Sequence, residues 1–267
     1  MLEFSVLASG SSGNALYIQT PNTKILLDSG ISGRQLQQRL QEVSGQSMAD
    51  LDALLLTHEH IDHVRGLRQV LKQSQAQVYT TQGTWHHVQD TAAKDLGSRT
   101  PNWVVAGEAF EVGDIRVTPF TVSHDAEEPV AYRFDCGQSS LAVATDLGYV
   151  SDSIKSVLAG CSCYVFESNH DVEMLRAGRY PWNVKRRILG DKGHLSNQDA
   201  AVALADLLDL KNDQVDVYLA HLSEENNQPD LAEITVSSVL TEIKSIYKEQ
   251  IRLKRTSRAQ ATTLHTL

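Results

Sequence analysis

The sequence predicts a layered α/β fold in one domain. Apolar runs that suit strands alternate with helical patterns along the chain, and polar residues follow the ends of those runs. The composition, with 41% hydrophobic and 21% charged residues, is that of an ordinary globular protein. A chain of 267 residues can build one large core. We therefore expect a single domain over residues 1–250 and a basic tail over residues 251–267.

Short strands open the chain, at residues 4–6, 16–18 and 25–27. They are separated by turn sequences, of which SGSSGN at 9–14 leads into a strand and is therefore better explained as a tight hairpin than as a phosphate cradle. Helical spacing follows at 36–43, and the apolar strand DALLLT then delivers His58 at its carboxyl end.

Strands and helices keep alternating towards the C-terminus. Strand patterns occupy residues 77–79, 115–122, 131–135, 140–145, 164–168 and 216–221, and helical patterns occupy 64–72, 197–208 and 231–247. The residues just beyond the strands are candidate functional residues, because α/β sheets carry their sites there: Asp28, His58, His124, Asp146, Glu167 and His221.

Charge and composition exclude some functions. The net charge is −9, so binding to nucleic acid must depend on local basic patches such as Lys185, Arg186 and Arg187. A run of this kind is usually a solvated helix face. The N-terminus lacks the pattern of a signal peptide and no apolar run approaches a membrane span, which predicts a cytoplasmic protein with no membrane partner. The three cysteines are too few for a disulfide framework.

The strongest chemical signal is the segment HEHIDH, with His58, His60, Asp62 and His63 directly after an apolar strand. Three imidazoles and a carboxylate so close together are typical of a metal site, and a loop can turn several of them inward. Imidazoles suit zinc, whereas a carboxylate in the set also suits manganese or iron. The competing interpretation, surface histidines on a loop, leaves the later polar residues at strand ends unexplained.

The order of these motifs resembles that of the metallo-β-lactamase superfamily, which runs Asp, HxHxDH, His, Asp, His. The resemblance implies an αββα sandwich with two divalent metal ions, of which zinc is favoured. It implies that one ion is held by His58, His60 and His124, and the other by Asp62, His63 and His221. Asp146 would bridge the ions, and Asp28 would orient a ligand without binding metal. Two such ions can share a hydroxide that attacks the substrate. We expect Asp62 to be a catalytic residue as well as a metal ligand.

The segment GDKGHLSNQDA bears on the substrate. Ser196 and Asp199 form a capping pattern before an apolar helix, whose N-terminus and Ser196 hydroxyl could hold a phosphate. His194 could then protonate the leaving oxygen. The simpler interpretation is a capped helix preceded by a surface histidine. Glu167 could orient His194 or bind substrate, although an acid at a strand end is often solvated.

His-x-Ser in this position resembles a motif of nucleases in the superfamily. SGSSGN, LLLDSG, HEHIDH, SHDAEEPVAY, ATDLGY, ESNHD and GHLSN together resemble the YycJ family, also called WalJ or VicX. That resemblance implies 5′ to 3′ exonuclease activity on DNA. Only 47 residues separate Asp146 from His194, too few for the inserted cap domain of β-CASP nucleases, so an open cleft is expected.

Two other functions stay open. A small-molecule phosphodiesterase, or a thioesterase resembling glyoxalase II, would use the same metals and suits the acidic composition. A noncatalytic regulatory partner would keep the metals for folding alone, but the complete set of predicted ligands and His194 count against it.

Overall fold

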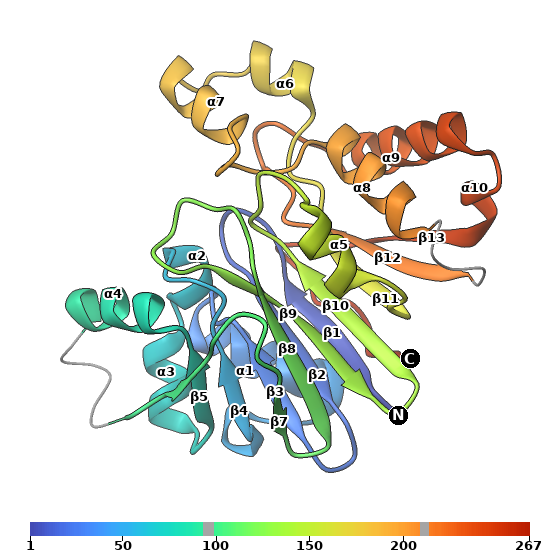
Figure 1. The fold of residues 1–267 in the computed structure, drawn as a ribbon. Helices are drawn as coiled ribbons and strands as arrows, with labels where there is room; N and C mark the ends of the chain where they lie inside the picture. Colours follow the sequence, from blue (N-terminus) through green and yellow to red (C-terminus); the bar gives the residue numbers. More distant parts are fainter. Residues whose placement is uncertain (93–98, 209–213) are drawn as a thin grey trace. The chain divides into compact units, whose positions relative to one another are not determined.

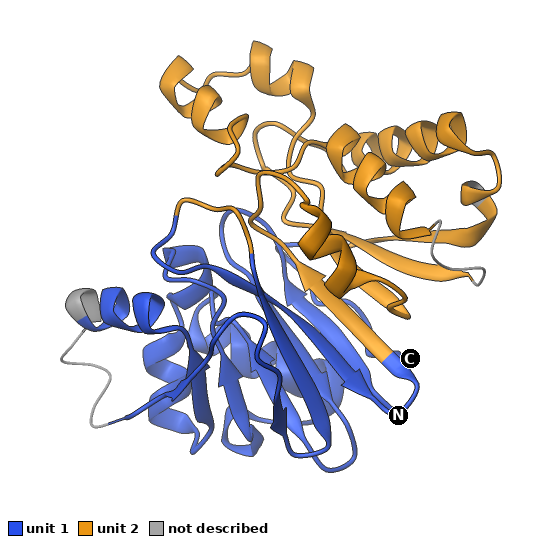
Figure 2. Ribbon diagram, in the orientation of Figure 1, with its two compact units in different colours: residues 1–121, 126–139, 256–267 blue, residues 122–125, 140–255 orange. Residues whose placement is uncertain are grey.

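The computed structural model describes residues 1–92, 99–208 and 214–267. The chain divides into two compact units (Figure 2). Unit 1 contains residues 1–121, 126–139 and 256–267, and unit 2 contains residues 122–125 and 140–255. Because HEHIDH belongs to unit 1 and the later predicted ligands belong to unit 2, each unit carries its own share of the candidate site.

Unit 1 is built on a seven-stranded mixed sheet with the order β14-β1-β2-β3-β4-β5-β6 (Figure 1). β1, β2 and β3 pair antiparallel, and β3 to β6 pair parallel. The strands are β1 (Glu3–Ala8), β2 (Ala15–Gln19), β3 (Lys24–Leu27), β4 (Ala53–Leu55), β5 (Gln77–Thr80), β6 (Asn102–Trp103) and β14 (His265–Thr266). Parallel pairing brings the carboxyl ends of β3 and β4, which lead to Asp28 and His58, to one edge of this sheet.

Helices cover one face of this sheet. They are α1 (Gly33–Ser44), η1 (Met48–Asp50), α2 (Ile61–Val64), α3 (Leu67–Gln73) and α4 (Gln82–Ala92). α1 begins at a capping box between Ser32 and Gln35 and ends where Gly45 adopts φ 71°. Leu36 and Leu40 lie one turn apart on its buried face and pack in a core with Leu26 and Leu54 from the sheet.

Three further strands of unit 1 pair antiparallel, namely β7 (Phe110–Val112), β8 (Ile115–Thr121) and β9 (Val130–Cys136). The Tyr132 hydroxyl donates to the Leu56 carbonyl at 2.9 Å, and the Val130 amide donates to the Thr57 carbonyl at 3.1 Å. β9 is therefore fastened to the segment between β4 and His58, which fixes the backbone just before the first predicted ligand.

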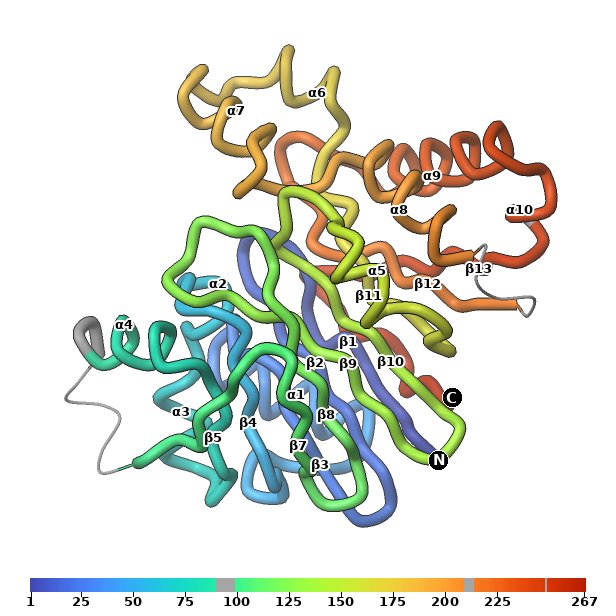
Figure 3. Tube along the Cα trace, in the orientation of Figure 1, coloured from blue at the N-terminus to red at the C-terminus, as the bar shows by residue number. Residues whose placement is uncertain are grey.

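Unit 2 carries a parallel set of strands, β10 (Ser139–Ala144), β11 (Cys163–Glu167), β12 (Val215–Ala220) and β13 (Ile251–Arg255). Its helices are α5 (Asp152–Leu158), α6 (Val172–Ala177), α7 (Trp182–Ile188), α8 (Asn197–Leu208), α9 (Pro229–Ile243) and α10 (Tyr247–Gln250). In the trace of unit 2, α6 and α7 form an arm that lies apart from α8 and α9 (Figure 3).

The last residues do not form the separate basic tail that the sequence suggested. Residues 251–255 are β13, which pairs with β12, and residues 265–266 are β14, which pairs with β1. Arg252 pairs with Asp216, and Arg255 pairs with Asp230 and Glu233. Basic residues alternate along β13, so a short edge strand looks like a charged tail in the sequence.

The predicted α/β architecture is confirmed, and most predicted elements lie within a few residues of their observed bounds. The elements that were not predicted include α4 and several short ones, among them α5, α6, α7 and β7, and short elements carry little periodicity. Cys161 and Cys163 are buried, and burial raises the pKa of the Cys163 thiol. In the described ranges, no helix has the length and apolarity to cross a membrane.

Candidate metal centre

The first group of predicted ligands follows β4 in unit 1, and we call His58, His60, Asp62 and His63 the unit 1 cluster. His58 and His63 are buried, and His60 and Asp62 are half-buried. α2 begins directly after His60, and the His60 carbonyl accepts from the His63 amide at 2.8 Å. This short turn of helix places Asp62 and His63 on the chain beside His58 and His60.

Asp28, at the end of β3, fixes the protonation of two ligands in the unit 1 cluster. Its Oδ2 accepts from the Nδ1–H of His63 at 2.7 Å and from the Thr57 hydroxyl at 2.8 Å. Because the Thr57 hydroxyl donates its only proton to Asp28, it can only accept from His58, whose Nδ1–H lies 3.0 Å away. The Nε2 atoms of His58 and His63 therefore carry the lone pairs that a metal ion would bind.

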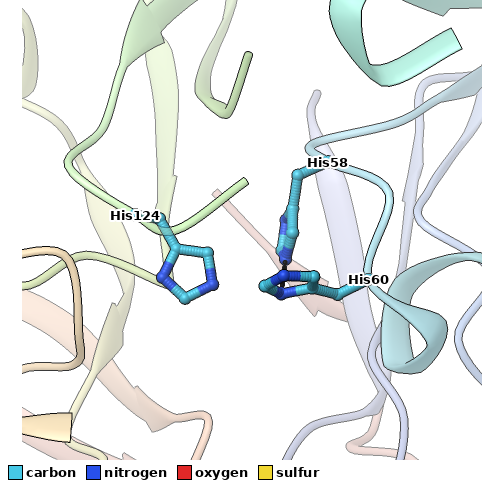
Figure 4. A group of neighbouring side chains, drawn as sticks. All are labelled: His58, His60 and His124. Atoms are coloured by element: carbon cyan, nitrogen blue, oxygen red, sulfur yellow. Dashed lines mark hydrogen bonds between the residues drawn. The ribbon is translucent and has the colours of Figure 1, made fainter. Parts of the chain in front are cut away.

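His58 and His60 face each other closely (Figure 4). His58 Nε2 lies 3.1 Å from His60 Nδ1, and their ring centroids are 4.6 Å apart. The His58 and His63 centroids are 4.1 Å apart. His58 Nε2 and His60 Nδ1 are within hydrogen-bonding distance, and two imidazole nitrogens this close to each other suit a divalent cation that would bind both.

The turn SGSSGN packs against this cluster. The Asn14 amide nitrogen donates to the Asp62 carbonyl at 2.7 Å, and the Asn14 side-chain nitrogen lies 3.1 Å from His63 Nε2. A Cβ on Gly30 would meet the Asp62 carbonyl oxygen at 1.6 Å. Glycine is thus required for the close approach of the Asp28 loop to α2, and the sequence interpretation of the turn as a simple hairpin missed Asn14.

Glu59, the residue between the first two histidines, holds the loop from the other side. Its Oε1 accepts from the Glu127 amide at 2.8 Å, and its Oε2 accepts from the Thr84 hydroxyl at 3.4 Å. Glu59 is buried. In the segment His58-Glu59-His60, the two histidines are therefore the predicted ligands, and the glutamate between them anchors the loop.

The second group lies in unit 2, and we call His124, Asp146, His194 and His221 the unit 2 cluster. Asp146 lies two residues beyond the end of β10, His221 directly follows β12, and His124 lies in the segment 122–125. The His194 ring centroid is 5.1 Å from that of His124 and 5.2 Å from that of His221. One ligand atom from each of Asp146, Glu167, His194 and His221 lies within 4.8 Å of the others.

Glu167, at the end of β11, organises the unit 2 cluster. Its Oε1 accepts from the Nδ1–H of His194 at 2.9 Å and from that of His221 at 2.8 Å, and its Oε2 accepts from the backbone amides of Leu147 and Leu195. Burial alone would raise the pKa of Glu167, but the charges and hydrogen bonds of His194 and His221 lower it below its ordinary value. The carboxylate stays ionised and leaves both Nε2 atoms for other partners.

His124 is oriented in the same way by a carbonyl. Its Nδ1–H donates to the Gly193 carbonyl at 3.3 Å, and its Nε2 lies 3.8 Å from Asp146 Oδ1. A Cβ on Gly193 would meet the Ile188 carbonyl oxygen at 2.1 Å, so glycine is needed where this segment passes the end of α7.

Three of the predicted motif residues adopt unusual backbone conformations. Among the described residues, the non-glycine residues with positive φ are Asp28 at 58°, Asp146 at 61° and His221 at 56°. Each follows the end of a strand. Such conformations cost about 1–3 kcal/mol and concentrate at functional sites. At each of these positions, the unusual backbone conformation changes the direction of the side chain just beyond the end of a strand.

The donors of both clusters fit divalent metal ions. Hydrogen bonds at Nδ1 fix the tautomers of the imidazole rings and leave their Nε2 atoms available to a metal ion. Asp62 and Asp146 supply carboxylate oxygens. This combination of donors binds zinc, manganese or iron. The Asn169 side chain donates to the His221 carbonyl at 2.8 Å, and the Asn227 side chain donates to the Ser168 and Asn169 carbonyls. This buried amide network, absent from the sequence prediction, fixes the backbone behind His221.

Three predicted substrate-binding residues have other roles. The Ser196 hydroxyl donates to Asp199 Oδ2 at 2.6 Å and accepts from the Asp199 amide, so it caps α8 rather than holding a phosphate. Lys185 is buried and donates to the carbonyls of Arg176 and Gly178. Glu167 is buried and engaged with histidines, so it cannot reach a substrate. The contacts agree with the two alternatives that the sequence left open, a capping role for Ser196 and an orienting role for Glu167, whereas the partners of Lys185 could not be seen in the sequence.

The remaining two predicted contacts differ from each other. Arg187 pairs with Asp125, the neighbour of His124, and Arg186 is exposed. Of the histidines that matched no motif, His86 and His87 are exposed, whereas His170 is buried and burial lowers its pKa to about 4. His170 is a neutral packing residue.

Comparisons with known proteins agree with this geometry. Residues 23–221 match the family model described as the beta-lactamase superfamily domain. The chain is 45% identical over 241 residues to "Exodeoxyribonuclease YycJ" of Bacillus anthracis, covering 90% of each protein. It is 41% identical over 243 residues to "Exodeoxyribonuclease WalJ" of Streptococcus pneumoniae, covering 90% of this chain and 88% of that protein. The metallo-beta-lactamase fold protein YhfI from Bacillus subtilis shares the fold, with a TM-score of 0.71 at 15% identity and 98% coverage of both chains.

Proposed function

Because this chain belongs to the β-lactamase superfamily, and within it to the family of the YycJ and WalJ exodeoxyribonucleases, we propose that it removes nucleotides from DNA by metal-dependent hydrolysis of phosphodiester bonds. The single observation that carries the proposal beyond a general metal site is the pair Glu167 and His194. A lactamase-type metal site needs no additional oriented imidazole, whereas cleavage of a phosphodiester benefits from a proton donor to the leaving oxygen.

We propose that the two clusters supply ligands to one pair of divalent ions, with zinc favoured and manganese or iron as alternatives. His58, His60 and His124 would hold one ion, Asp62, His63 and His221 would hold the other, and Asp146 would be shared. The order of the ligands in the family supports this assignment. Bound ions would act as Lewis acids and activate water for attack on phosphorus.

The chain's own groups prepare the proton transfers. Asp28 and Thr57 keep Nδ1 of His63 and His58 protonated, so their Nε2 atoms remain available as ligands. Glu167 does the same for His194, whose Nε2 is the atom that would face the substrate. Because Glu167 holds Nδ1 of His194, the Nε2 atom is the one from which a proton would pass to the leaving oxygen as the bond to phosphorus breaks.

The proposal is tested with the purified protein loaded with zinc or manganese and given 5′-phosphorylated duplex and single-stranded DNA, with RNA of the same sequence beside it. A 5′ to 3′ exonuclease releases the 5′-terminal nucleotide first. We expect Asp146→Asn to abolish release and His194→Ala to lower kcat by roughly 10²–10⁴-fold.

Asp135→Asn is the matched control, since Asp135 is a half-buried acid paired with Arg133 on β9. The control should keep full activity. If no nucleic acid is cut with any metal while a thioester or a cyclic nucleotide is turned over, the nuclease proposal is overturned in favour of a small-molecule hydrolase.

A further inference from the structure

The arm of unit 2, residues 171–192 with α6 and α7, differs in charge from the rest of the protein. It contains six basic and three acidic residues, although the net charge of the chain is −9. Within unit 2 the arm lies apart from α8 and α9 (Figure 3). Positive charge is therefore concentrated on one separate helical element of an acidic protein.

Half of these cations have structural partners. Arg176 pairs with Glu173 at 2.9 Å, Arg187 pairs with Asp125, and Lys185 donates to backbone carbonyls. The other three are exposed, and their side chains form no hydrogen bond or ion pair within the described part of the chain: Arg179, Arg186 and Lys192. These three are available to an anionic partner.

The arm also exposes a large aromatic ring. Trp182, the first residue of α7, is 64% exposed. Arg186 lies one turn further on the same face of α7, and Leu189, which is 41% exposed, follows it. The Lys185 side chain is buried, and its ammonium group donates to the carbonyls of Arg176 and Gly178, which fastens α7 to the end of α6. An exposed indole with a cation one turn away is the combination on which nucleobases stack beside their phosphates.

Hydrogen bonds connect the arm to the unit 2 cluster. The His194 amide donates to the Ile188 carbonyl at 3.0 Å, and the Ser123 hydroxyl donates to the Asp191 carbonyl at 2.6 Å. A Cβ on Gly148 would meet the Asp191 carbonyl oxygen at 2.2 Å, so the loop after Asp146 packs against the arm's last turn. Tyr149 in that loop is 48% exposed. The end of the arm is thus held by hydrogen bonds and close packing against the segments that carry His124, Asp146 and His194.

We propose that this arm binds single-stranded DNA, with Trp182 stacking on a base and Arg186 contacting the adjoining phosphate. The inference rests on the proposed function and specifies that the DNA held beside the site is single-stranded. Base faces are covered inside a duplex, so an exposed indole selects an unpaired end or a flexible strand. The positive charge of the arm favours the polyanion over a second copy of this acidic chain.

The test measures binding of a fluorescent 20-nucleotide single strand by anisotropy, in the full-length Asp146→Asn background so that the strand stays intact. We expect Trp182→Ala to raise the Kd roughly tenfold, and Trp182→Phe to restore most of the affinity because an aromatic face remains. Arg186→Ala should reduce the slope of log Kd against log salt by about 0.7, the value for one phosphate contact on a single strand. Trp103→Ala removes the same ring from an exposed position on β6 and should leave Kd unchanged.

Activity assays separate this inference from the proposed function. With otherwise wild-type protein, Trp182→Ala should raise KM for DNA roughly tenfold and leave hydrolysis of bis(p-nitrophenyl) phosphate, which is too small to span the arm, unchanged. Absence of DNA cleavage by the wild type overturns the proposed function, and the Kd series still decides the role of the arm. An equal Kd for Trp182→Ala and the parent overturns the inference, as does a dimer in sedimentation that Trp182→Ala dissociates without any change in Kd.

Discussion

Glu167 contributes to the site without needing to touch a substrate or a metal ion. One oxygen accepts from His194 and His221, and the other accepts from two backbone amides, so the carboxylate fixes the tautomers of both rings together with the chain around them. From the sequence, Glu167 could orient His194 or bind substrate, and its position at a strand end does not decide between the two. Its role follows from the contact between β11 and two distant loops.

Glu167→Gln should lower kcat and metal affinity, each by about 10–100-fold, because an amide has one acceptor oxygen and no charge to hold two imidazole N–H groups. Steady-state kinetics and metal content by mass spectrometry measure the two effects. Glu173→Gln, at an exposed position of α6, is the control and should change neither. A variant that keeps full metal content and full kcat would show that the histidines orient themselves without Glu167.

Asp28 has the corresponding role in the unit 1 cluster. Asp28→Asn keeps a residue type that tolerates the φ of 58° while removing the carboxylate that holds the Nδ1–H of His63. We expect metal affinity to fall by about 10–100-fold with little change in the far-UV circular dichroism spectrum. Competition with a chromophoric chelator measures the affinity. Unchanged affinity in Asp28→Asn would mean that Thr57 alone orients the ring.

At the scale of elements, close backbone packing holds the unit 1 cluster in place. Gly30→Ala would drive a methyl group into the Asp62 carbonyl and should displace α2, lowering both the melting temperature and metal affinity. Gly45→Ala is the matched control, because a Cβ there has no close neighbour and its cost of ~1 kcal/mol comes from the αL backbone at the end of α1. The control should lower the melting temperature while metal affinity stays constant. Equal metal affinity in both variants would refute the packing argument.

Much of the fold could be predicted from the sequence because the strands and long helices carry strong periodicity. Leu36 and Leu40 in α1, and the apolar run before His58, each indicate the correct element. The predicted metal motifs were noticeable because Asp28, His58, Asp146 and His221 each lie within three residues of the end of a strand. α6 and α7 are too short to carry such a signal, and β13 has basic residues in alternate positions, so its pairing with β12 was not predictable.

The substrate-side predictions depended on local composition, which does not show where a side chain points. Lys185, Arg186 and Arg187 are consecutive, yet one is buried, one is exposed and one is paired with Asp125. Helical geometry points consecutive residues in different directions, so a run of like charges cannot act as one patch. Asn14 was missed for a different reason, since a turn asparagine gives no sign of the distant loop it contacts.

At the scale of the whole molecule, the proposed pair of metal ions would draw ligands from unit 1 and unit 2 alike. Binding of a ligand to the native state alone stabilises it by about 2.7 kcal/mol when the free metal is a hundredfold above Kd. For a chain of this size we expect metal loading to raise the melting temperature by roughly 5–10 °C, and chelation to reverse the change. Calorimetry with and without zinc or manganese gives the shift.

The variants His58→Ala and His221→Ala determine whether the two clusters act as one site, because each removes a ligand from a different unit. If the two clusters share the ions, either substitution should remove most of the metal-dependent rise in melting temperature. Either substitution should also lower the amount of metal that both clusters bind. His86→Ala, an exposed histidine of α4, is the control and should keep the full rise. If His221→Ala instead retains one tightly bound ion and half of the thermal shift while His58→Ala retains the other, each unit binds its metal independently, and the shared centre must be abandoned.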